Sequence, residues 1–136
     1  MKKQTLRIVL LVVIMAIALS ACGNAAAQAT TNLTVTMTDF EFNPTSSTVP
    51  AGETITLKLI NNGAVAHEWA LLSSPVEIPF DDEDEAKILF EAEVEAGESA
   101  TVTFTAPAAA GEYEVVCAIP GHLEAGMIGK LIVVQP

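Results

Sequence analysis

Hydrophobic and polar residues alternate with a period of two along several short stretches of the chain. Leu33, Val35 and Met37 alternate with threonines, and the same alternation recurs in residues 54–59 and 101–104. A period of two places one face of a stretch toward a core and the other toward solvent, as in a half-buried strand. Residues 113–117 and 128–134 indicate two further strands.

Turn-forming residues separate these predicted strands. They occur at 43–44, 50–52, 61–63, Gly97 and 109–111. Several short strands at this spacing predict an all-β fold, an antiparallel β-sandwich with Greek-key connections. Residues 32–136 are long enough for one such domain, and the sequence shows neither an internal repeat nor a second domain.

A long acidic insertion interrupts the regular spacing between residues 72 and 99. It contains the run Asp81, Asp82, Glu83, Asp84 and Glu85. Acidic side chains stabilise a helix N-terminus, so residues 83–90 are a candidate short helix. Two interpretations of the run remain open, a solvated loop that aids solubility and a docking patch for a basic partner.

The N-terminal segment has the organisation of an export signal. Lys2, Lys3 and Arg7 precede the unbroken apolar run 8–19, which is too short for a membrane-spanning helix of about 20 residues. The small residues before Cys22 resemble a bacterial lipobox, in which cleavage leaves the cysteine as a lipid-carrying N-terminus. We therefore expect a lipoprotein signal peptide at 1–21, a lipid-anchored flexible linker at 22–31 and a folded domain at 32–136. The alternatives are plain secretory cleavage nearby and an uncleaved short membrane anchor.

Removing this signal leaves a strongly acidic chain. Only Lys58, Lys87 and Lys130 remain against 17 acidic residues. Phosphate binding requires lysine and arginine, so the composition argues against nucleic acid as a partner. An anionic membrane would also repel the chain, so attachment would depend on lipid on Cys22. The expected location is extracytoplasmic, on a bacterial cell membrane, facing the periplasm or the outer surface.

Candidate chemistry gathers near the C-terminus, where Cys117, His122 and Met127 follow one another at intervals of five residues. The other histidine is His67. A thiolate, two imidazoles and a thioether suit copper, and two histidines and a cysteine with a weak axial methionine form the blue-copper pattern. If Cys22 carries lipid, Cys117 is an unpaired thiol in an oxidising compartment, and coordination to a metal explains it simply.

The order of the motifs resembles that of the cupredoxins of the plastocyanin and azurin group. The resemblance covers residues 39–44, 49–53, 61–67 and 117–127. The spacing around Pro120-Gly121-His122 is most similar to that of auracyanin-like, membrane-tethered members.

This resemblance implies a monomeric electron-transfer protein with one mononuclear type 1 copper ion. His67, Cys117 and His122 would be the strong equatorial ligands and Met127 the weak axial one. The electron would leave through His122, within an apolar surface formed by Gly63, Ala64, Val65, Pro120, Leu123 and Ala125. The expected partner is a basic c-type cytochrome or a membrane electron-transfer complex.

One position departs from the family pattern. Glu68 occupies the place where cupredoxins usually have an asparagine whose side chain connects the two ligand loops. Its side chain would either lie near the metal, where an ionised carboxylate lowers the reduction potential, or point to solvent. In both cases the backbone N–H of residue 68 could still donate to the Cys117 sulfur.

Other functions fit the residues less well. A hydrolase with Cys117 as nucleophile would leave Met127 unexplained and has no clear residue to orient a histidine base. Zinc bound by His67, Cys117 and His122 is chemically possible. Copper oxidases and nitrite reductases need additional histidines, so we do not expect an enzyme. The main alternative to electron transfer is a copper-binding protein for copper delivery or buffering.

Overall fold

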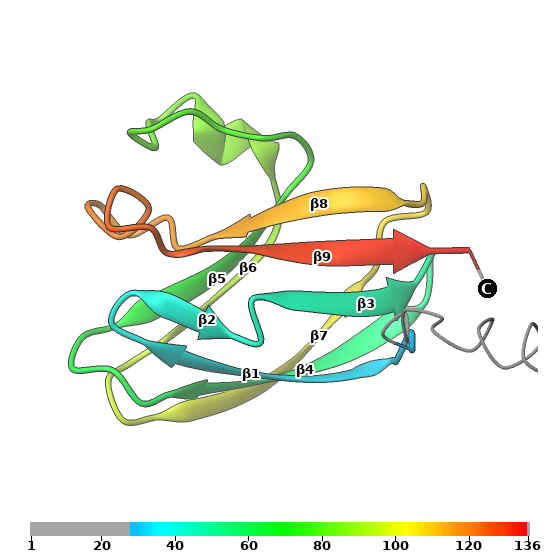
Figure 1. Ribbon diagram of the computed structural model, residues 1–136, viewed down its shortest axis with the longest axis horizontal. Helices are drawn as coiled ribbons and strands as arrows, with labels where there is room; N and C mark the ends of the chain where they lie inside the picture. Colours follow the sequence, from blue (N-terminus) through cyan, green and yellow to red (C-terminus); the bar gives the residue numbers. More distant parts are fainter. Residues whose placement is uncertain (1–27, 136) are drawn as a thin grey trace, which may run out of the picture.

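Two β-sheets lie face to face in the computed structural model, which describes residues 28–135 (Figure 1). One sheet has the order β2-β1-β4-β7 and the other the order β3-β9-β8-β5-β6. The strands are β1 (Asn32–Thr38), β2 (Glu41–Asn43), β3 (Ser46–Pro50), β4 (Thr54–Asn61), β5 (His67–Leu72), β6 (Ile88–Val94), β7 (Ser99–Thr105), β8 (Gly111–Val116) and β9 (Ile128–Val134). The expected all-β sandwich is confirmed. The predicted signal peptide, the lipidation site Cys22 and most of the linker lie outside the described residues.

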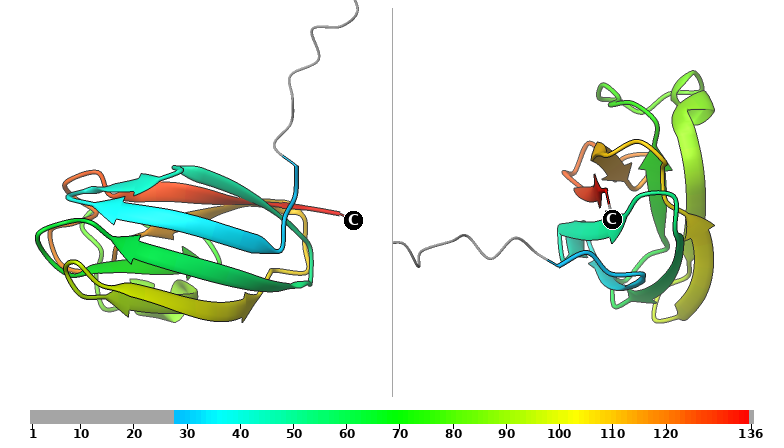
Figure 2. Two further views of the ribbon diagram at one scale, coloured as in Figure 1. Left: turned by 90° about the horizontal axis from the view of Figure 1, so that it is seen from below. Right: turned by 90° about the vertical axis from the view of Figure 1, so that its right-hand side faces the viewer.

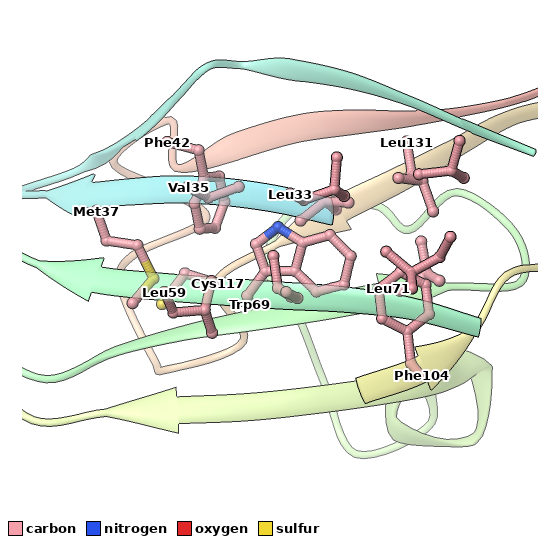
Figure 3. Close-up of a cluster of buried hydrophobic side chains, with 14 of the residues drawn as sticks. Leu33, Val35, Met37, Phe42, Leu59, Trp69, Leu71, Phe104, Cys117 and Leu131 are labelled. Carbon is pink, nitrogen blue, oxygen red and sulfur yellow. The ribbon is translucent and has the colours of Figure 1, made fainter. Parts of the chain in front are cut away.

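The alternation in the sequence becomes the burial pattern of the strands. Leu33, Val35 and Met37 of β1 point into the space between the sheets, whereas the threonines between them are more exposed. In the neighbouring strand β4 every second side chain is buried in the same way. Trp69 lies in the middle of this core, with its ring centroid 5.5 Å from that of Phe104 (Figure 3). Burial of these side chains supplies the main favourable free energy of folding.

Two strand pairs are parallel, so the sandwich is mixed rather than wholly antiparallel. β1 runs parallel to β4, and β3 runs parallel to β9. The cause is the path of the chain after β2, because residues 44–45 lead directly into β3 in the other sheet. The chain then reverses and returns to the first sheet as β4, which runs in the direction of β1 (Figure 1).

The acidic insertion contains less helix than residues 83–90 suggested. A short 3-10 helix, η2, covers Asp84–Lys87, and β6 already begins at Ile88. From residue 88 the alternation of side chains suits pairing with β5, where Leu72 opposes Ile88. The insertion also packs Val76, Phe80 and Ile88 against a second small apolar cluster on β5 and β8. This packing gives the insertion a structural role in addition to its charge.

Four connections lie at one end of the sandwich. They are the β1–β2 turn, the β4–β5 loop, the β6–β7 turn and the long β8–β9 loop, all at the left in Figure 1 and in the left view of Figure 2, opposite the C-terminal end of β9. Within residues 28–135, no helix is long and apolar enough to cross a membrane. All the candidate metal ligands lie at this end of the sandwich.

Candidate metal centre

Strand ends fix three of the four candidate ligands. His67 is the first residue of β5, Cys117 directly follows β8 and Met127 directly precedes β9. His122 lies between the last two, in a loop where its N–H donates to the Ile119 carbonyl at 3.0 Å and its own carbonyl accepts from the Met127 N–H at 3.0 Å. Gly121 takes a φ of 88°, a conformation that residues with a Cβ rarely adopt. The loop is therefore held in shape by its own backbone hydrogen bonds.

The donor atoms of His67, Cys117 and His122 lie within 4.8 Å of one another. Nδ1 of His67 is 3.2 Å from Nδ1 of His122. Nδ1 of His122 is in turn 3.2 Å from the Cys117 sulfur. Metal–nitrogen bonds of about 2.0–2.1 Å at tetrahedral angles place two nitrogens about 3.3 Å apart. The spacing of these side chains therefore fits one metal ion bound through both Nδ1 atoms and the sulfur.

Burial controls the protonation of these donors. Cys117 is fully buried, and burial raises the pKa of its thiol, although the N–H of Glu68 donates to the sulfur at 3.3 Å and acts in the opposite direction. This N–H contact is the one expected from the sequence. Burial, followed by the neighbouring His67, lowers the pKa of His122, so its ring is neutral at neutral pH. A neutral imidazole can bind a metal directly, whereas the thiol must lose its proton when the metal binds.

Met127 is fully buried, like Cys117 and His67. It belongs to the same apolar cluster as Cys117, and its carbonyl accepts a hydrogen bond from the Cys117 N–H at 3.2 Å. The side chain is therefore on the core side of the ligand loop. Its role as the axial ligand stays a prediction.

Asp39 and Phe40, in the β1–β2 turn, were not assigned a role from the sequence. Oδ1 of Asp39 lies 2.8 Å from Nε2 of His67. The Phe40 ring meets both histidine rings edge to face, with centroid distances of 6.0 Å to His67 and 4.8 Å to His122. Both residues lie in a motif that supports the family resemblance. Only the folded chain shows that this turn touches the ligands.

Four of the six residues expected to form an apolar surface around His122 are exposed. They are Ala64, Val65, Pro120 and Ala125, and Val65 is 44% accessible to solvent, whereas Gly63 is half-buried. Leu123 does not belong to this surface. It is 2% exposed, because its side chain packs beneath the loop against Ala70, Leu72 and Val116. The half-exposed Phe40 extends the apolar surface instead.

Glu68 lines a surface groove of about 720 Å³ beside the ligand loop. Burial, followed by the charges of Glu91 and Glu93, raises the pKa of Glu68. The N–H of Ala118 lowers this pKa, and Ala118 lines the same groove as Glu68, so the Glu68 side chain lies beside the ligand loop. The sequence left two positions open for the Glu68 side chain, near the metal or directed to solvent. Because the residue is half-buried, a side chain directed fully to solvent does not fit.

The acidic run divides into structural and outward-facing residues. Asp84 is 7% exposed and binds Nζ of Lys87 at 2.7 Å, while Oδ1 of Asp81 accepts the N–H of Glu83 at 2.9 Å. Asp82 and Glu85 are exposed and line the groove. Asp81 lines the groove as well, whereas the exposed Glu83 lies outside its lining.

The arrangement of two sheets with a cysteine, two histidines and a methionine at one end defines the class of small copper-binding β-sandwiches. Residues 8–133 match the Cupredoxin-like domain family. This chain belongs to that family.

Individual relatives agree with this assignment. The chain is 33% identical to auracyanin-A of Chloroflexus aurantiacus, over 96% of this chain and 99% of the relative. It is 34% identical to the copper-resistant cuproprotein CopI of Rubrivivax gelatinosus, over 79% of this chain and 69% of the relative. The solved structure of auracyanin A is described as a "blue" copper protein from the green thermophilic photosynthetic bacterium Chloroflexus aurantiacus. It superposes on this chain with a TM-score of 0.61. That structure is 31% identical, and the match covers 76% of this chain and 99% of the solved chain.

Proposed function

We propose that this chain is an electron-transfer protein that carries one electron on a single copper ion held by His67, Cys117, His122 and Met127. The observation that carries the proposal is the convergence of both Nδ1 atoms and the Cys117 sulfur at the end of a closed core. Thiolate, imidazole and thioether donors are the set that blue-copper sites use. The copper would alternate between Cu(I) and Cu(II), and the chain itself would catalyse no further reaction.

The surroundings of the ligands suit repeated one-electron transfer. His67 and Cys117 are fully buried at strand ends, so the protein would limit their movement when the copper charge changes. His122 is the partly exposed ligand, and the half-exposed Phe40 ring meets it edge to face. Its ring would connect the copper to a redox partner at the surface.

The first test is to add Cu(II) to the purified protein and to record its visible and electron paramagnetic resonance spectra. We expect intense blue or green absorption, because a short bond between Cu(II) and a thiolate gives strong charge transfer. The Cys117→Ser variant should be nearly colourless. Wild-type protein that is saturated with Cu(II) yet shows only pale, tetragonal-type signals would contradict the proposal.

The second candidate function, copper delivery or buffering, has one observation in its favour. The relative from Rubrivivax gelatinosus is named as a copper-resistant cuproprotein. A delivery protein should release copper readily to a competing chelator, whereas an electron carrier should retain it through reversible oxidation and reduction. Chelator competition combined with voltammetry therefore distinguishes the two functions.

We propose that the groove beside the ligand loop docks a basic redox partner, such as a c-type cytochrome. Asp81, Asp82, Glu85 and Glu91 contribute negative charge to it, and Ile119 and Pro120 of the ligand loop form part of its wall. A cationic surface seated there would lie beside the loop that carries His122. Complementary charge of this kind mainly raises the rate of association.

We also propose extracytoplasmic attachment to a bacterial cell membrane, facing the periplasm or the outer surface, through lipid on Cys22. The support comes from the sequence, where the apolar run 8–19 is followed by small residues and a cysteine. Cys22→Ser should release the protein from the membrane fraction, and mass spectrometry of the wild type should find an acylated N-terminal cysteine. Wild-type protein without acyl chains would contradict the lipid anchor and leave the copper proposal intact.

A further inference from the structure

The side of His67 that faces away from the other donors is in contact with a carboxylate. Nε2 of His67 lies 2.8 Å from Oδ1 of Asp39, which is 28 residues earlier in the sequence. The ring of His67 is fully buried, and the Asp39 side chain is 34% exposed. An ionised carboxylate can only accept hydrogen bonds, so Nε2 must carry the proton. The neutral ring then has its lone pair on Nδ1, the nitrogen that faces His122.

Asp39 is itself held in place. The N–H of Ala64 donates to its two carboxylate oxygens at 3.1 and 3.0 Å. The loop that contains Ala64 is fixed by the buried Asn61, whose amide donates to the carbonyls of Val65 and Val94 at 2.8 Å. Rotation of the carboxylate away from His67 would therefore break hydrogen bonds to the β4–β5 loop as well.

Gly63 makes the close approach possible. A Cβ at this position would collide with Oδ1 of Asp39 and would lie 2.7 Å from Nε2 of His67. The N–H of Gly63 donates to Oδ1 of Asn61 at 2.8 Å, and this hydrogen bond holds Gly63 beside the contact between Asp39 and His67. Three separate elements, the β1–β2 turn, the β4–β5 loop and the start of β5, thus meet at one hydrogen bond.

We propose that Asp39 is a positioning residue for the copper ligand His67. Its carboxylate holds the ring in the tautomer that directs the Nδ1 lone pair toward His122 and Cys117, and its negative charge makes the imidazole a stronger donor to copper. Partners of this kind behind a ligand histidine fix its tautomer and raise its basicity. This inference rests on the proposed copper site. It assigns a role to a residue outside the four predicted ligands.

The first test does not require copper. In the metal-free protein labelled with ¹⁵N-histidine, nuclear magnetic resonance reports which nitrogen of each ring carries the proton. We expect His67 to be the Nε2–H tautomer in the wild type and in Asp39→Asn, because the asparagine oxygen can still accept the hydrogen bond. Asp39→Ala should give a mixture of tautomers. A pure Nε2–H tautomer in Asp39→Ala would overturn the proposal.

The second test uses the copper-loaded protein and separates charge from contact. Asp39→Asn should keep the wild-type absorption spectrum and raise the reduction potential, because the loss of the negative charge disfavours Cu(II). Asp39→Ala should also weaken copper binding, by about 10- to 100-fold for the loss of such a partner. Glu41→Gln is the matched control, since it removes an exposed carboxylate at the start of β2, two residues after Asp39. Equal potentials in Asp39→Asn and Glu41→Gln would overturn the charge effect.

Gly63→Ala offers an independent variant that leaves both partners unchanged. The added methyl group must separate Asp39 from His67, so we expect the mixed tautomers and the weaker copper binding of Asp39→Ala. Wild-type tautomer and affinity in Gly63→Ala would contradict the inference. A wild type that never becomes blue would contradict the proposed function, while the tautomer measurement would still decide the role of Asp39.

Discussion

The axial position is where a single side chain should tune the copper most directly. Met127 is fully buried on the core side of the ligand loop. We expect Met127→Gln to keep a coloured site and to lower the reduction potential, because an oxygen donor stabilises Cu(II) relative to Cu(I). Voltammetry of the purified protein measures this change. An unchanged potential would mean that Met127 is not the axial ligand.

Glu68 should make the stability of the metal-free protein depend on pH. Burial and the charges of Glu91 and Glu93 raise its pKa in the folded protein, so ionising it opposes folding. This cost is present above the ordinary carboxyl pKa and absent below it. Glu68→Gln should therefore raise the free energy of unfolding at neutral pH, and the gain should disappear below pH ~4.

Urea unfolding of the metal-free protein at the two pH values tests this prediction. Glu98→Gln, at an exposed position in the β6–β7 turn, is the control. The same gain in Glu98→Gln would assign the effect to the general negative charge of the chain. A gain that grows as the pH falls would contradict the expected sign.

At the scale of elements, Asn61 connects β4, the β4–β5 loop and the end of β6. It is 1% exposed, and its side chain makes three hydrogen bonds, to the backbone of Gly63, Val65 and Val94. Asn61→Ala leaves buried backbone groups without partners, and each such group costs about 1–3 kcal/mol. We expect the free energy of unfolding to fall by about 2–4 kcal/mol.

The exposed neighbour Asn62 supplies the control for this measurement. Asn62→Ala should change the free energy of unfolding by less than about 0.5 kcal/mol, as is usual for surface substitutions. Equal losses in the two variants would show that the buried amide of Asn61 does not organise the loop.

At the scale of the whole molecule, the acidic groove should control the rate of association with a basic partner. The Debye length falls from about 30 Å at 0.01 M salt to about 10 Å at 0.1 M, so electron transfer to a basic cytochrome should slow steeply as salt is added. Neutralising the exposed pair, Asp82→Asn with Glu85→Gln, should slow the low-salt reaction and flatten this dependence. The copper spectrum should not change.

Stopped-flow oxidation by the cytochrome measures these rates. The control is Glu53→Gln with Glu112→Gln, which removes two exposed carboxylates away from the groove. The same salt profile in the groove variant and the wild type would leave the acidic insertion as a solvated loop that packs on the sheet.

Sequence patterns predicted five of the nine strands, β1, β4, β7, β8 and β9, together with the side chains that offer metal-binding chemistry, but they did not predict β2, β3, β5 and β6. The alternation in β1, β4 and β7 is local, since each side chain's direction follows from its position in the strand. The scarcity of histidine and the spacing of Cys117, His122 and Met127 were also readable along the chain. The sequence alone was misleading at residues 88–90, where pairing with β5 prevails over the helix suggested by the preceding acidic residues.

The tertiary structure decided which distant residues meet. His67 and His122 are 55 positions apart, and the contact between Asp39 and His67 joins a turn to a strand in the opposite sheet. The groove beside Glu68 likewise exists only because the insertion folds back over β5 and β8. Local sequence patterns carry no information on such contacts. These contacts depend on the order of the strands in the two sheets and on where the chain crosses between the sheets.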